Sequence, residues 1–348
     1  AEDGIRDVER SRGLGDVYKR QVPMKQVLDE AIKGDYGVGA YNVNNMEQIQ
    51  GIMRAASETR SPVIIQASRG ALKYTNMVYI KHLAAAAVED NPDIPIVLHL
   101  DHGNSLETCK QAIELGFTSV MIDGSLKEDS KTPTTFEENV SVTREVVEYA
   151  HKFGVSVEGE LGTLGGIEDG VGSGKVMLTD PDEAARFVKL TGVDALALAI
   201  GTSHGAYKFK TKPTLAMDII NEVVKRIPGV PLVMHGSSSV PQELIEIINK
   251  YGGKLEKTMG VPMESIKEAI KRGIRKINVD TDGRLAMTGA VRKYLSENPD
   301  AFDPRTYFGA AREAVYQTVK GKMIDFGTAG HAGDYKPMTL EEMKAIYR

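Results

Sequence analysis

The stretch Ile96-Val-Leu-His-Leu-Asp-His102-Gly103 is an apolar run of strand length that ends in an acid, a histidine and a glycine. Seven other short runs of β-branched or aliphatic residues are spread along the chain. Nearly continuous apolar runs of this length are typical of parallel strands that are buried on both faces. The seven other runs cover residues 38–43, 63–67, 119–122, 156–160, 195–200, 232–234 and 275–279.

Helix-compatible segments separate these runs. In one of them, Asp180-Pro181-Asp-Glu provides an N-cap, a proline at the first helical position and acids in the first turn. Eight alternating strand–helix units predict an α/β fold, a (β/α)8 TIM barrel. The alternative is a doubly wound sheet, which usually has a glycine-rich turn after its first strand. Tyr41-Asn-Val-Asn-Asn follows the first run here and contains no glycine. The helix-compatible segments include residues 46–59, 106–115, 136–153, 181–191 and 215–226.

The ends of the chain depart from a minimal barrel. Residues 1–21 carry many charges and glycines without amphipathic periodicity, and we interpret them as a disordered or non-native extension. Residues 22–348 are predicted to form a single barrel domain. Helical patterns at 283–295 and 304–324 follow the eighth strand and predict extra C-terminal helices. These helices would pack on a partner subunit, and together with the family resemblance given below they favour a homodimer or homotetramer.

The composition of the chain indicates which partners, cysteine-based sites and cellular location are expected. The chain has 348 residues, 41% of them hydrophobic, and 43 basic against 48 acidic residues give a net charge of −5. This balance gives no basic face for nucleic acid. Cys109 is the only cysteine, so an intrachain disulfide and a thiolate-rich metal site are excluded, and a reducing, cytoplasmic location is expected. No apolar run is long enough to span a membrane, so we expect no membrane partner.

Three histidines, each followed by glycine, come at or just after the ends of the third, sixth and seventh strand-like runs. They are His102, His204 and His235. A parallel barrel brings the ends of distant strands to one mouth, and three neutral imidazoles with an open fourth position form a catalytic zinc site. His99, which lies inside the third run, is interpreted as a hydrogen-bonded core residue.

Acidic residues accompany these histidines. Asp101 directly precedes His102, where it would orient a metal ligand or transfer a proton. Asp123 ends the fourth run, and Glu158 and Glu160 end the fifth with a spacing that places them on one face. Carboxylates near a zinc predict a second cation or an alternative zinc position.

Loops after the strands supply two further features. The glycine-rich insertion LGTLGGIEDGVGSGK, residues 161–175, is predicted to be a mobile lid that carries Glu168 and Asp169 as acids. A second insertion covers residues 251–260. Barrels often bind phosphate through the loops after strands seven and eight. The candidate phosphate segments are Gly205 with Lys208, Gly236 to Ser239, and Asn278 to Thr281.

The ends of the predicted strands lack a lysine, which indicates what kind of electrophile the site would use. An enzyme that activates a carbonyl substrate through a Schiff base needs a lysine projecting into the mouth. None of the eight strand ends carries a lysine, since Lys208 is in a loop and Lys276 is at the start of the last predicted strand. The electrophile is therefore predicted to be a metal.

Taken together and in order, these motifs resemble the class II, zinc-dependent fructose-1,6-bisphosphate aldolases. The resemblance runs from about Val22 to the C-terminus and is closest to the longer bacterial subgroup. It rests on Val97-Leu-His-Leu-Asp-His-Gly, Glu158-Gly-Glu-Leu-Gly, Gly165-Gly-Ile-Glu-Asp-Gly, Gly201-Thr-Ser-His-Gly, His235-Gly-Ser-Ser and Asn278-Val-Asp-Thr-Asp. Some relatives read His-Gly-Gly-(Ser/Thr)-Gly where this chain has His235-Gly-Ser237-Ser-Ser239.

The resemblance implies reversible cleavage of fructose 1,6-bisphosphate into dihydroxyacetone phosphate and glyceraldehyde 3-phosphate through a zinc-stabilised enediolate. It assigns the catalytic zinc to His102, His204 and His235, and a second divalent ion to Asp123 and Glu160. Asp101 is implied to protonate the aldehyde oxygen and Glu168 to remove the proton from dihydroxyacetone phosphate. Family members also often hold a monovalent cation, Na⁺ or K⁺. The implied substrate-binding residues are Ser68, Gly205, Lys208, Gly236, Ser237, Ser238, Asn278, Val279, Asp280, Thr281 and Arg284.

Three alternatives stay open. Cleavage of tagatose 1,6-bisphosphate would use the same machinery. A zinc hydrolase on a TIM barrel would need neither a base on the lid nor two phosphate loops. A non-catalytic barrel that binds sugar phosphates would need neither Asp101 nor Glu168.

Overall fold

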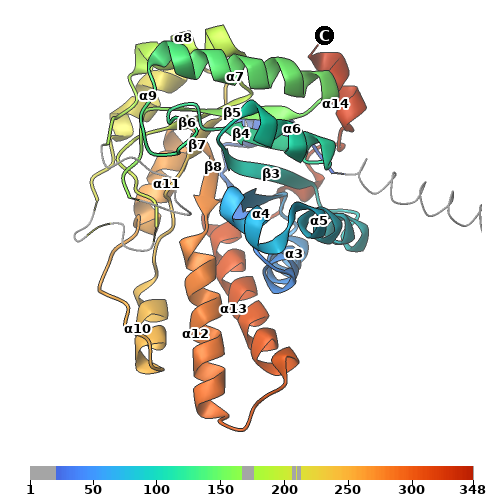
Figure 1. Cartoon of the computed structure of the whole chain (residues 1–348), viewed down its shortest axis with the longest axis vertical. Helices are drawn as coiled ribbons and strands as arrows, with labels where there is room; N and C mark the ends of the chain where they lie inside the picture. The colour runs from blue at the N-terminus through green and yellow to red at the C-terminus, as the bar shows by residue number, and fades with distance from the viewer. Residues whose placement is uncertain (1–20, 167–175, 206–208, 210–212, 348) are drawn as a thin grey trace, which may run out of the picture.

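A computed structural model describes residues 21–166, 176–205, 209 and 213–347. Within these ranges, eight parallel strands pair in chain order and close into a barrel, with β8 hydrogen-bonded to β1 (Figure 1). The prediction of a (β/α)8 barrel is confirmed and the doubly wound sheet is excluded. The strands are β1 (Val38–Asn42), β2 (Val63–Ser68), β3 (Ile96–Gly103), β4 (Ser119–Ile122), β5 (Ser156–Leu161), β6 (Ala195–Leu198), β7 (Leu232–Met234) and β8 (Ile274–Val279).

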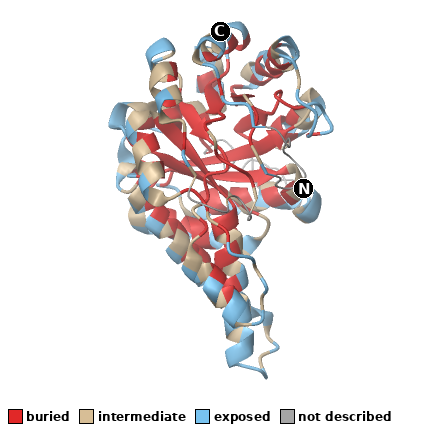
Figure 2. Ribbon diagram, turned by 90° about the vertical axis from the view of Figure 1, so that its left-hand side faces the viewer, coloured by how far each residue is buried: buried red, intermediate tan, exposed pale blue. Residues whose placement is uncertain are grey.

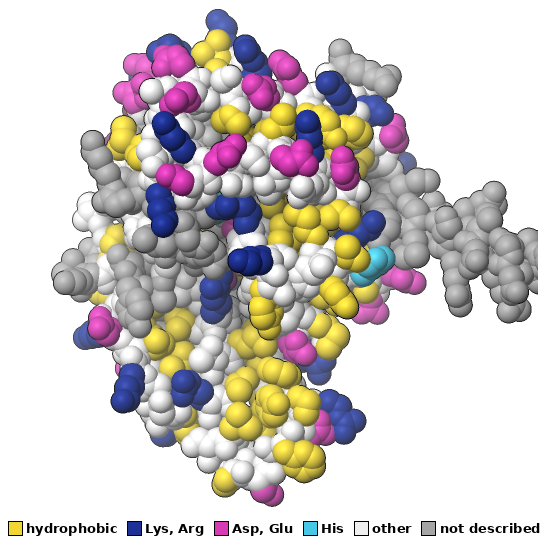
Figure 3. Space-filling model, in the orientation of Figure 1, with side chains coloured by type: hydrophobic (Ala, Val, Ile, Leu, Met, Phe, Trp, Pro, Cys, Tyr) yellow, Lys and Arg dark blue, Asp and Glu magenta, His cyan; other side chains and the backbone are white. Residues whose placement is uncertain are grey.

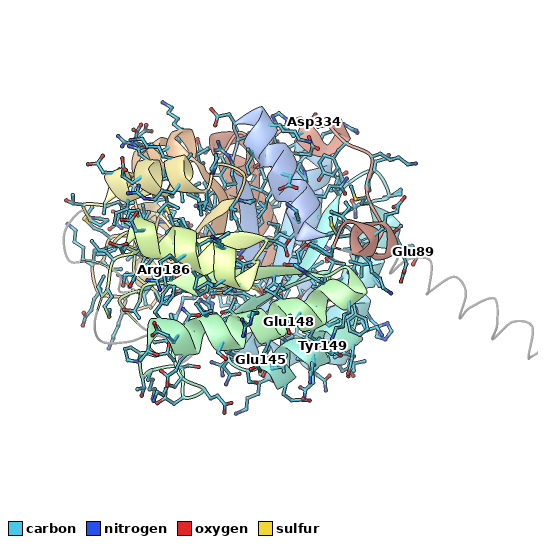
Figure 4. All side chains as sticks on the ribbon, turned by 90° about the horizontal axis from the view of Figure 1, so that it is seen from above. Glu89, Glu145, Glu148, Tyr149, Arg186 and Asp334 are labelled. Atoms are coloured by element: carbon cyan, nitrogen blue, oxygen red, sulfur yellow. The ribbon has the colours of Figure 1, made fainter. Side chains whose placement is uncertain are left out.

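Helices surround the barrel, and the predicted local signals account for several of their boundaries. Asp180 caps α8 by accepting hydrogen bonds from the backbone N–H groups of Asp182 and Glu183, each at 2.9 Å. The outer face of α7 carries charged side chains, as Glu145 and Glu148 illustrate (Figure 4). Elsewhere the surface mixes charged side chains with exposed hydrophobic ones (Figure 3). The helices are α2 (Met24–Gly34), α3 (Met46–Thr59), α4 (Arg69–Thr75), α5 (Met77–Asp90), α6 (Leu106–Glu114), α7 (Phe136–Ala150), α8 (Pro181–Thr191), α9 (Met217–Arg226), α10 (Gln242–Lys250), α11 (Met263–Arg272), α12 (Thr281–Glu297), α13 (Pro304–Asp325) and α14 (Leu340–Ile346), with 3₁₀ turns η1 (His151–Phe153) and η2 (His331–Gly333).

The core occupies the barrel and the ring between strands and helices (Figure 2). Every residue of β2, β3, β5 and β8 is buried. β2 and β3 are largely apolar, as expected for strands buried on both faces, whereas β5 and β8 also bury the charged residues Glu158, Glu160, Arg275 and Lys276. Helix α2 packs Met24, Val27 and Leu28 against inward-facing strand residues such as Ala40 and Val97. Our interpretation of residues 1–21 stays a prediction, because all of them except Gln21 lie outside the described ranges.

The extra C-terminal helices form a projecting antiparallel pair. Helices α12 and α13 run side by side away from the barrel, and α13 also packs along α3 (Figure 1). Among the described residues, no helix is long and apolar enough to cross a membrane.

The single cysteine lies deep in this architecture. Cys109 on α6 is 0% exposed, and burial raises the pKa of its thiol to about 12. We expect the native protein not to react with a thiol reagent such as DTNB at pH 8, because both access and thiolate are lacking. Unfolding in guanidinium should release one reactive thiol per chain. Rapid labelling of the native protein would contradict the burial of Cys109.

Candidate active site

Three imidazoles converge at one mouth of the barrel. His102 belongs to the end of β3, His204 follows β6 and His235 follows β7. One ring nitrogen of each lies within 4.8 Å of those of the other two, and all three side chains are buried. The ring centroid of His102 is 5.0 Å from that of His204 and 4.8 Å from that of His235. The structure thus brings together the three histidines that the sequence singled out.

The backbone at the end of β3 explains how two adjacent residues face the same pocket. Side chains of neighbouring strand residues normally point in opposite directions. Here the β3–β4 register shifts between Leu100 and Gly103, and His102 has a φ of +52°, in the left-handed region. This local turn lets both Asp101 and His102 line the pocket.

The electrostatics of the three histidines suit a divalent cation. Burial by itself would lower the pKa of His102, but the carboxylates of Asp101 and Asp123 outweigh it and raise that pKa to about 10. Burial, reinforced by the positive charges of His102 and Lys276, holds the pKa of His235 well below its usual value. The Nδ1 atom of His235 lies only 3.1 Å from Nε2 of His102. Two imidazoles whose nitrogens face each other this closely fit a shared cation, which binds them in the neutral form.

A second group of possible ligands adjoins the first. His102, Asp123 and Glu160 also bring one ligand atom each within 4.8 Å of one another, and His102 Nδ1 is 3.2 Å from Asp123 Oδ2. Among the described residues, Glu160 Oε2 is buried without a hydrogen-bond partner. Burial, together with the nearby charge of Asp123, raises the pKa of Glu160 well above its usual range. An orphaned carboxylate oxygen beside a second carboxylate fits a second cation position.

Asp101 is held by two amide side chains. Its Oδ2 accepts a hydrogen bond from Asn42 Nδ2 at 2.9 Å, and its Oδ1 accepts one from Asn278 Nδ2 at 3.3 Å. Asn42 is itself fixed, because its Oδ1 accepts from Gln66 Nε2 at 2.6 Å. Asn42 is a site residue that the sequence motifs did not indicate, although a polar residue at the end of the first strand was a usable signal.

The pocket at the mouth contains many of the predicted substrate-binding residues. Asn42, Arg69 and Gly70 are additions that the motifs did not indicate. Arg69 Nε donates to the carbonyl of His102 at 2.9 Å, which joins α4 to the end of β3. The complete lining is Asn42, Ser68, Arg69, Gly70, Asp101, His102, His204, His235, Gly236, Ser237, Ser238, Asn278 and Asp280.

The remaining predicted residues lie around this pocket or beyond the described ranges. Gly205 follows His204, and Val279 and Thr281 flank the pocket residue Asp280. Arg284 on α12 turns back onto Asp280, with Nε and Nη2 at 2.7 and 2.6 Å from its two carboxylate oxygens. Glu168, Asp169 and Lys208 lie outside the described residues.

The loop after β7 takes a conformation that requires glycine. Gly236 has a φ of +61°, and a Cβ added there would lie 2.6 Å from the carbonyl oxygen of Ser203. Ser237, one of the departures from relatives, donates its hydroxyl to the carbonyl of Met234 at 2.7 Å. Ser238 Oγ accepts a hydrogen bond from the backbone N–H of Asp280 at 3.2 Å, which ties this loop to the one after β8.

Gly236→Ala should therefore damage the loop. We expect it to destabilise the fold by about 1–3 kcal/mol, because an L-residue is strained at this φ and its Cβ meets backbone. Gly309→Ala on α13 is a matched control, since a Cβ there meets nothing within 4 Å. Urea unfolding of both variants measures the difference, and equal stabilities would contradict the described loop geometry.

A buried ionic cluster lies beneath the histidines. Glu158 Oε1 is 2.7 Å from Nε2 of His235, and Glu158 Oε2 is 2.9 Å from Nζ of Lys276. His99 donates to or accepts from Ser119 Oγ at 2.8 Å, as expected for a core histidine. Lys276 was placed at the start of the last strand, but it is the third residue of β8 and points into the barrel beside Asn278. Lys276 is not among the residues that line the pocket, and its Nζ is engaged in the salt bridge with Glu158.

Comparison with known proteins gives the family. The model of the family Fructose-bisphosphate aldolase class-II matches residues 22–331. The fructose-bisphosphate aldolase of Giardia intestinalis is 58% identical over 327 residues, which is 93% of this chain and 98% of that protein. The fructose-bisphosphate aldolase of Nostoc sp. is 54% identical over 341 residues, 94% of this chain and 95% of the relative. The solved structure of the YdjI aldolase from Escherichia coli K12 matches with a TM-score of 0.71 and 30% identity, covering 90% of this chain and 99% of that one. This chain belongs to the class II fructose-bisphosphate aldolase family.

Proposed function

We propose that this protein cleaves fructose 1,6-bisphosphate reversibly into dihydroxyacetone phosphate and glyceraldehyde 3-phosphate. The observation that carries the proposal is one pocket in which three converging imidazoles, a fixed carboxylate and two loops with backbone donors meet. Membership of the family supplies the reaction class, a carbon–carbon lyase. The residues in the pocket supply the individual roles.

The metal proposed for this site is zinc, held by His102, His204 and His235. Three neutral nitrogen donors with an open position match the ligands of catalytic zinc. When bound there, zinc is a Lewis acid that polarises the ketone of dihydroxyacetone phosphate and so acidifies the adjacent carbon. The buried cluster of Glu158 and Lys276 orients His235 from beneath.

Asp101 is proposed to transfer the proton at the aldehyde oxygen. Its two amide partners, Asn42 and Asn278, hold both carboxylate oxygens in the pocket. A fixed acid within reach of the reacting oxygen gives the proton a short path in both directions of the reaction. By its match to the family motif, Glu168 is proposed as the base that removes the proton from dihydroxyacetone phosphate.

The two phosphate groups of the substrate need separate binders. For dihydroxyacetone phosphate we propose the loops after β6, β7 and β8, which contain Gly205, Lys208, residues 236–238 and residues 278–281. For the other phosphate we propose Ser68, which lines the pocket, and Arg284, which lies against the pocket residue Asp280. Ser68 Oγ accepts a hydrogen bond from the N–H of Ala71 at 3.2 Å, which fixes its side chain at the start of α4.

Further partners follow from the same family pattern. Asp123 and Glu160, together with His102, are proposed to hold a second divalent ion, and a monovalent cation such as Na⁺ or K⁺ is proposed near the phosphate-binding carbonyls.

The projecting helices α12 and α13 favour a homodimer or homotetramer (Figure 1). A cytoplasmic location fits the reducing environment that a single buried cysteine suggests.

The test is a cleavage assay with fructose 1,6-bisphosphate combined with measurement of bound metal. About one zinc per chain and release of triose phosphate would support the proposal, and hydrolysis without triose phosphate would favour a zinc hydrolase. Comparison of kcat/KM for fructose and tagatose bisphosphates separates the two sugars. A higher value for tagatose would replace the proposed substrate while leaving the mechanism intact.

A further inference from the structure

A buried ion pair joins the C-terminal helices to the loop after β7. Asp282 lies in the first turn of α12 and Lys322 in the last turn of α13. The Nζ of Lys322 is 2.5 Å from Oδ2 of Asp282, and the two side chains are 5% and 0% exposed. A buried pair is stable only when further hydrogen bonds satisfy its remaining donors and acceptors. The other hydrogen-bond partners of Asp282 and Lys322 therefore indicate which part of the structure the ion pair stabilises.

The further partners belong to the loop. Asp282 Oδ2 accepts hydrogen bonds from the backbone N–H and the hydroxyl of Ser239, each at 2.9 Å. Asp282 Oδ1 accepts one from the N–H of Val240 at 2.8 Å. Lys322 Nζ also donates to Ser239 Oγ at 3.1 Å. The ion pair is thus a clamp on residues 239 and 240.

The loop needs such a clamp because its backbone is strained. Val240 has a φ of +49°, in the left-handed region that a β-branched residue rarely adopts. The carboxylate of Asp282 accepts the two successive N–H groups of Ser239 and of Val240 itself, which lead into this strained point. Burial opposes ionisation, but Lys322 and the loop N–H groups outweigh it and hold the pKa of Asp282 below its usual value.

The clamped residues continue directly into the part of the loop that lines the pocket, residues 236–238. We propose that Asp282 and Lys322 are positioning residues for phosphate recognition. By fixing Ser239 and Val240, they aim the backbone donors of the preceding residues at the phosphate of dihydroxyacetone phosphate. The inference rests on the proposed function. It adds that the ammonium group of Lys322 on α13 controls the affinity for phosphate without contacting the substrate.

The side chain of Ser239 takes part in the same arrangement. Its hydroxyl both donates to Asp282 and accepts from Lys322. The side chain therefore completes the clamp instead of entering the pocket. Ser239→Ala removes these two contacts and leaves the ion pair in place.

The decisive variant is the double change Asp282→Asn with Lys322→Met, which removes both charges and leaves neither ion buried without a partner. We expect the KM for fructose 1,6-bisphosphate and the inhibition constant of inorganic phosphate to rise about 10- to 100-fold, the usual effect of losing hydrogen bonds to a charged group. Bound zinc and kcat should stay within about threefold of the parent protein. Ser239→Ala should fold normally and raise both constants by about 3- to 10-fold.

The control is Lys320→Met on the same helix. Lys320 forms an ion pair with Glu58 of α3, so its loss perturbs α13 without affecting the loop. Unchanged phosphate inhibition in both Ser239→Ala and the double variant would overturn the inference, as would an equal rise in Lys320→Met. If the double variant does not fold, Ser239→Ala alone decides. Phosphate binding to the zinc-loaded parent, measured by calorimetry, keeps this test separate from the choice of sugar substrate.

Discussion

Asp101→Ala should lower the rate of fructose 1,6-bisphosphate cleavage by roughly 10²–10⁴-fold, the usual contribution of a general acid or base. The structure leaves no second acid in an equivalent position among the residues that line the pocket, because Asp280 is bound to Arg284. Without the carboxylate, the side-chain amides of Asn42 and Asn278 lose their shared acceptor and would hydrogen-bond to water or to each other. The loss should appear in kcat, since Asp101 acts on the reacting oxygen.

The half-reactions give a sharper readout of the same variant. Exchange of the carbon-bound proton of dihydroxyacetone phosphate with solvent requires the metal and the base but not the aldehyde. We therefore expect exchange to persist in Asp101→Ala while condensation with glyceraldehyde 3-phosphate is lost. Asp101→Asn, which preserves the shape of the side chain, is the matched variant and should lose as much activity. Near-normal turnover with zinc still bound would remove Asp101 from the mechanism.

Removal of the metal should abolish activity, with a loss of at least about 10³-fold, because a Lewis acid contributes several kcal/mol to stabilising developing negative charge. Treatment with a chelator, followed by assay before and after addition of zinc, measures the effect. The melting temperature should fall as well, since a ligand that binds only the folded state stabilises that state. In the metal-free protein we expect His102 to be protonated, because the carboxylates of Asp101 and Asp123 outweigh burial and raise its pKa to about 10.

Borohydride distinguishes this metal mechanism from a Schiff base. Reduction in the presence of dihydroxyacetone phosphate should leave the enzyme active and unlabelled. Lys276, the buried lysine beside the histidines, is ion-paired with Glu158 and is not available as a nucleophile. Covalent trapping of substrate, or full activity after complete removal of zinc, would contradict the assignment of the three histidines.

The local pattern of the sequence was sufficient to predict the fold. Strand identity depends on short apolar runs, and helix ends depend on nearby caps such as Asp180, so both are encoded within a few residues of the chain. The order of eight such units then indicates a closed parallel barrel. The same reasoning placed His102, His204 and His235 at one mouth, because the ends of parallel strands meet there.

The structure added contacts between residues far apart in the chain. Asn42 reaches Asp101 across 59 positions, and Lys276 reaches Glu158 across the interior of the barrel. Neither pairing has a local signal, since each depends on the register in which the strands close. The left-handed turn at His102 is likewise a consequence of the irregular pairing of β3 with β4.

Local patterns in the sequence were enough to predict the barrel, the order of its strands and the residue types at its mouth. Which carboxylate faces which imidazole, and that Asp282 and Lys322 hold the loop after β7, became known from the folded arrangement. Secondary structure follows from the short-range periodicity of apolar residues, whereas side-chain pairing depends on the closure of the barrel and the docking of α13.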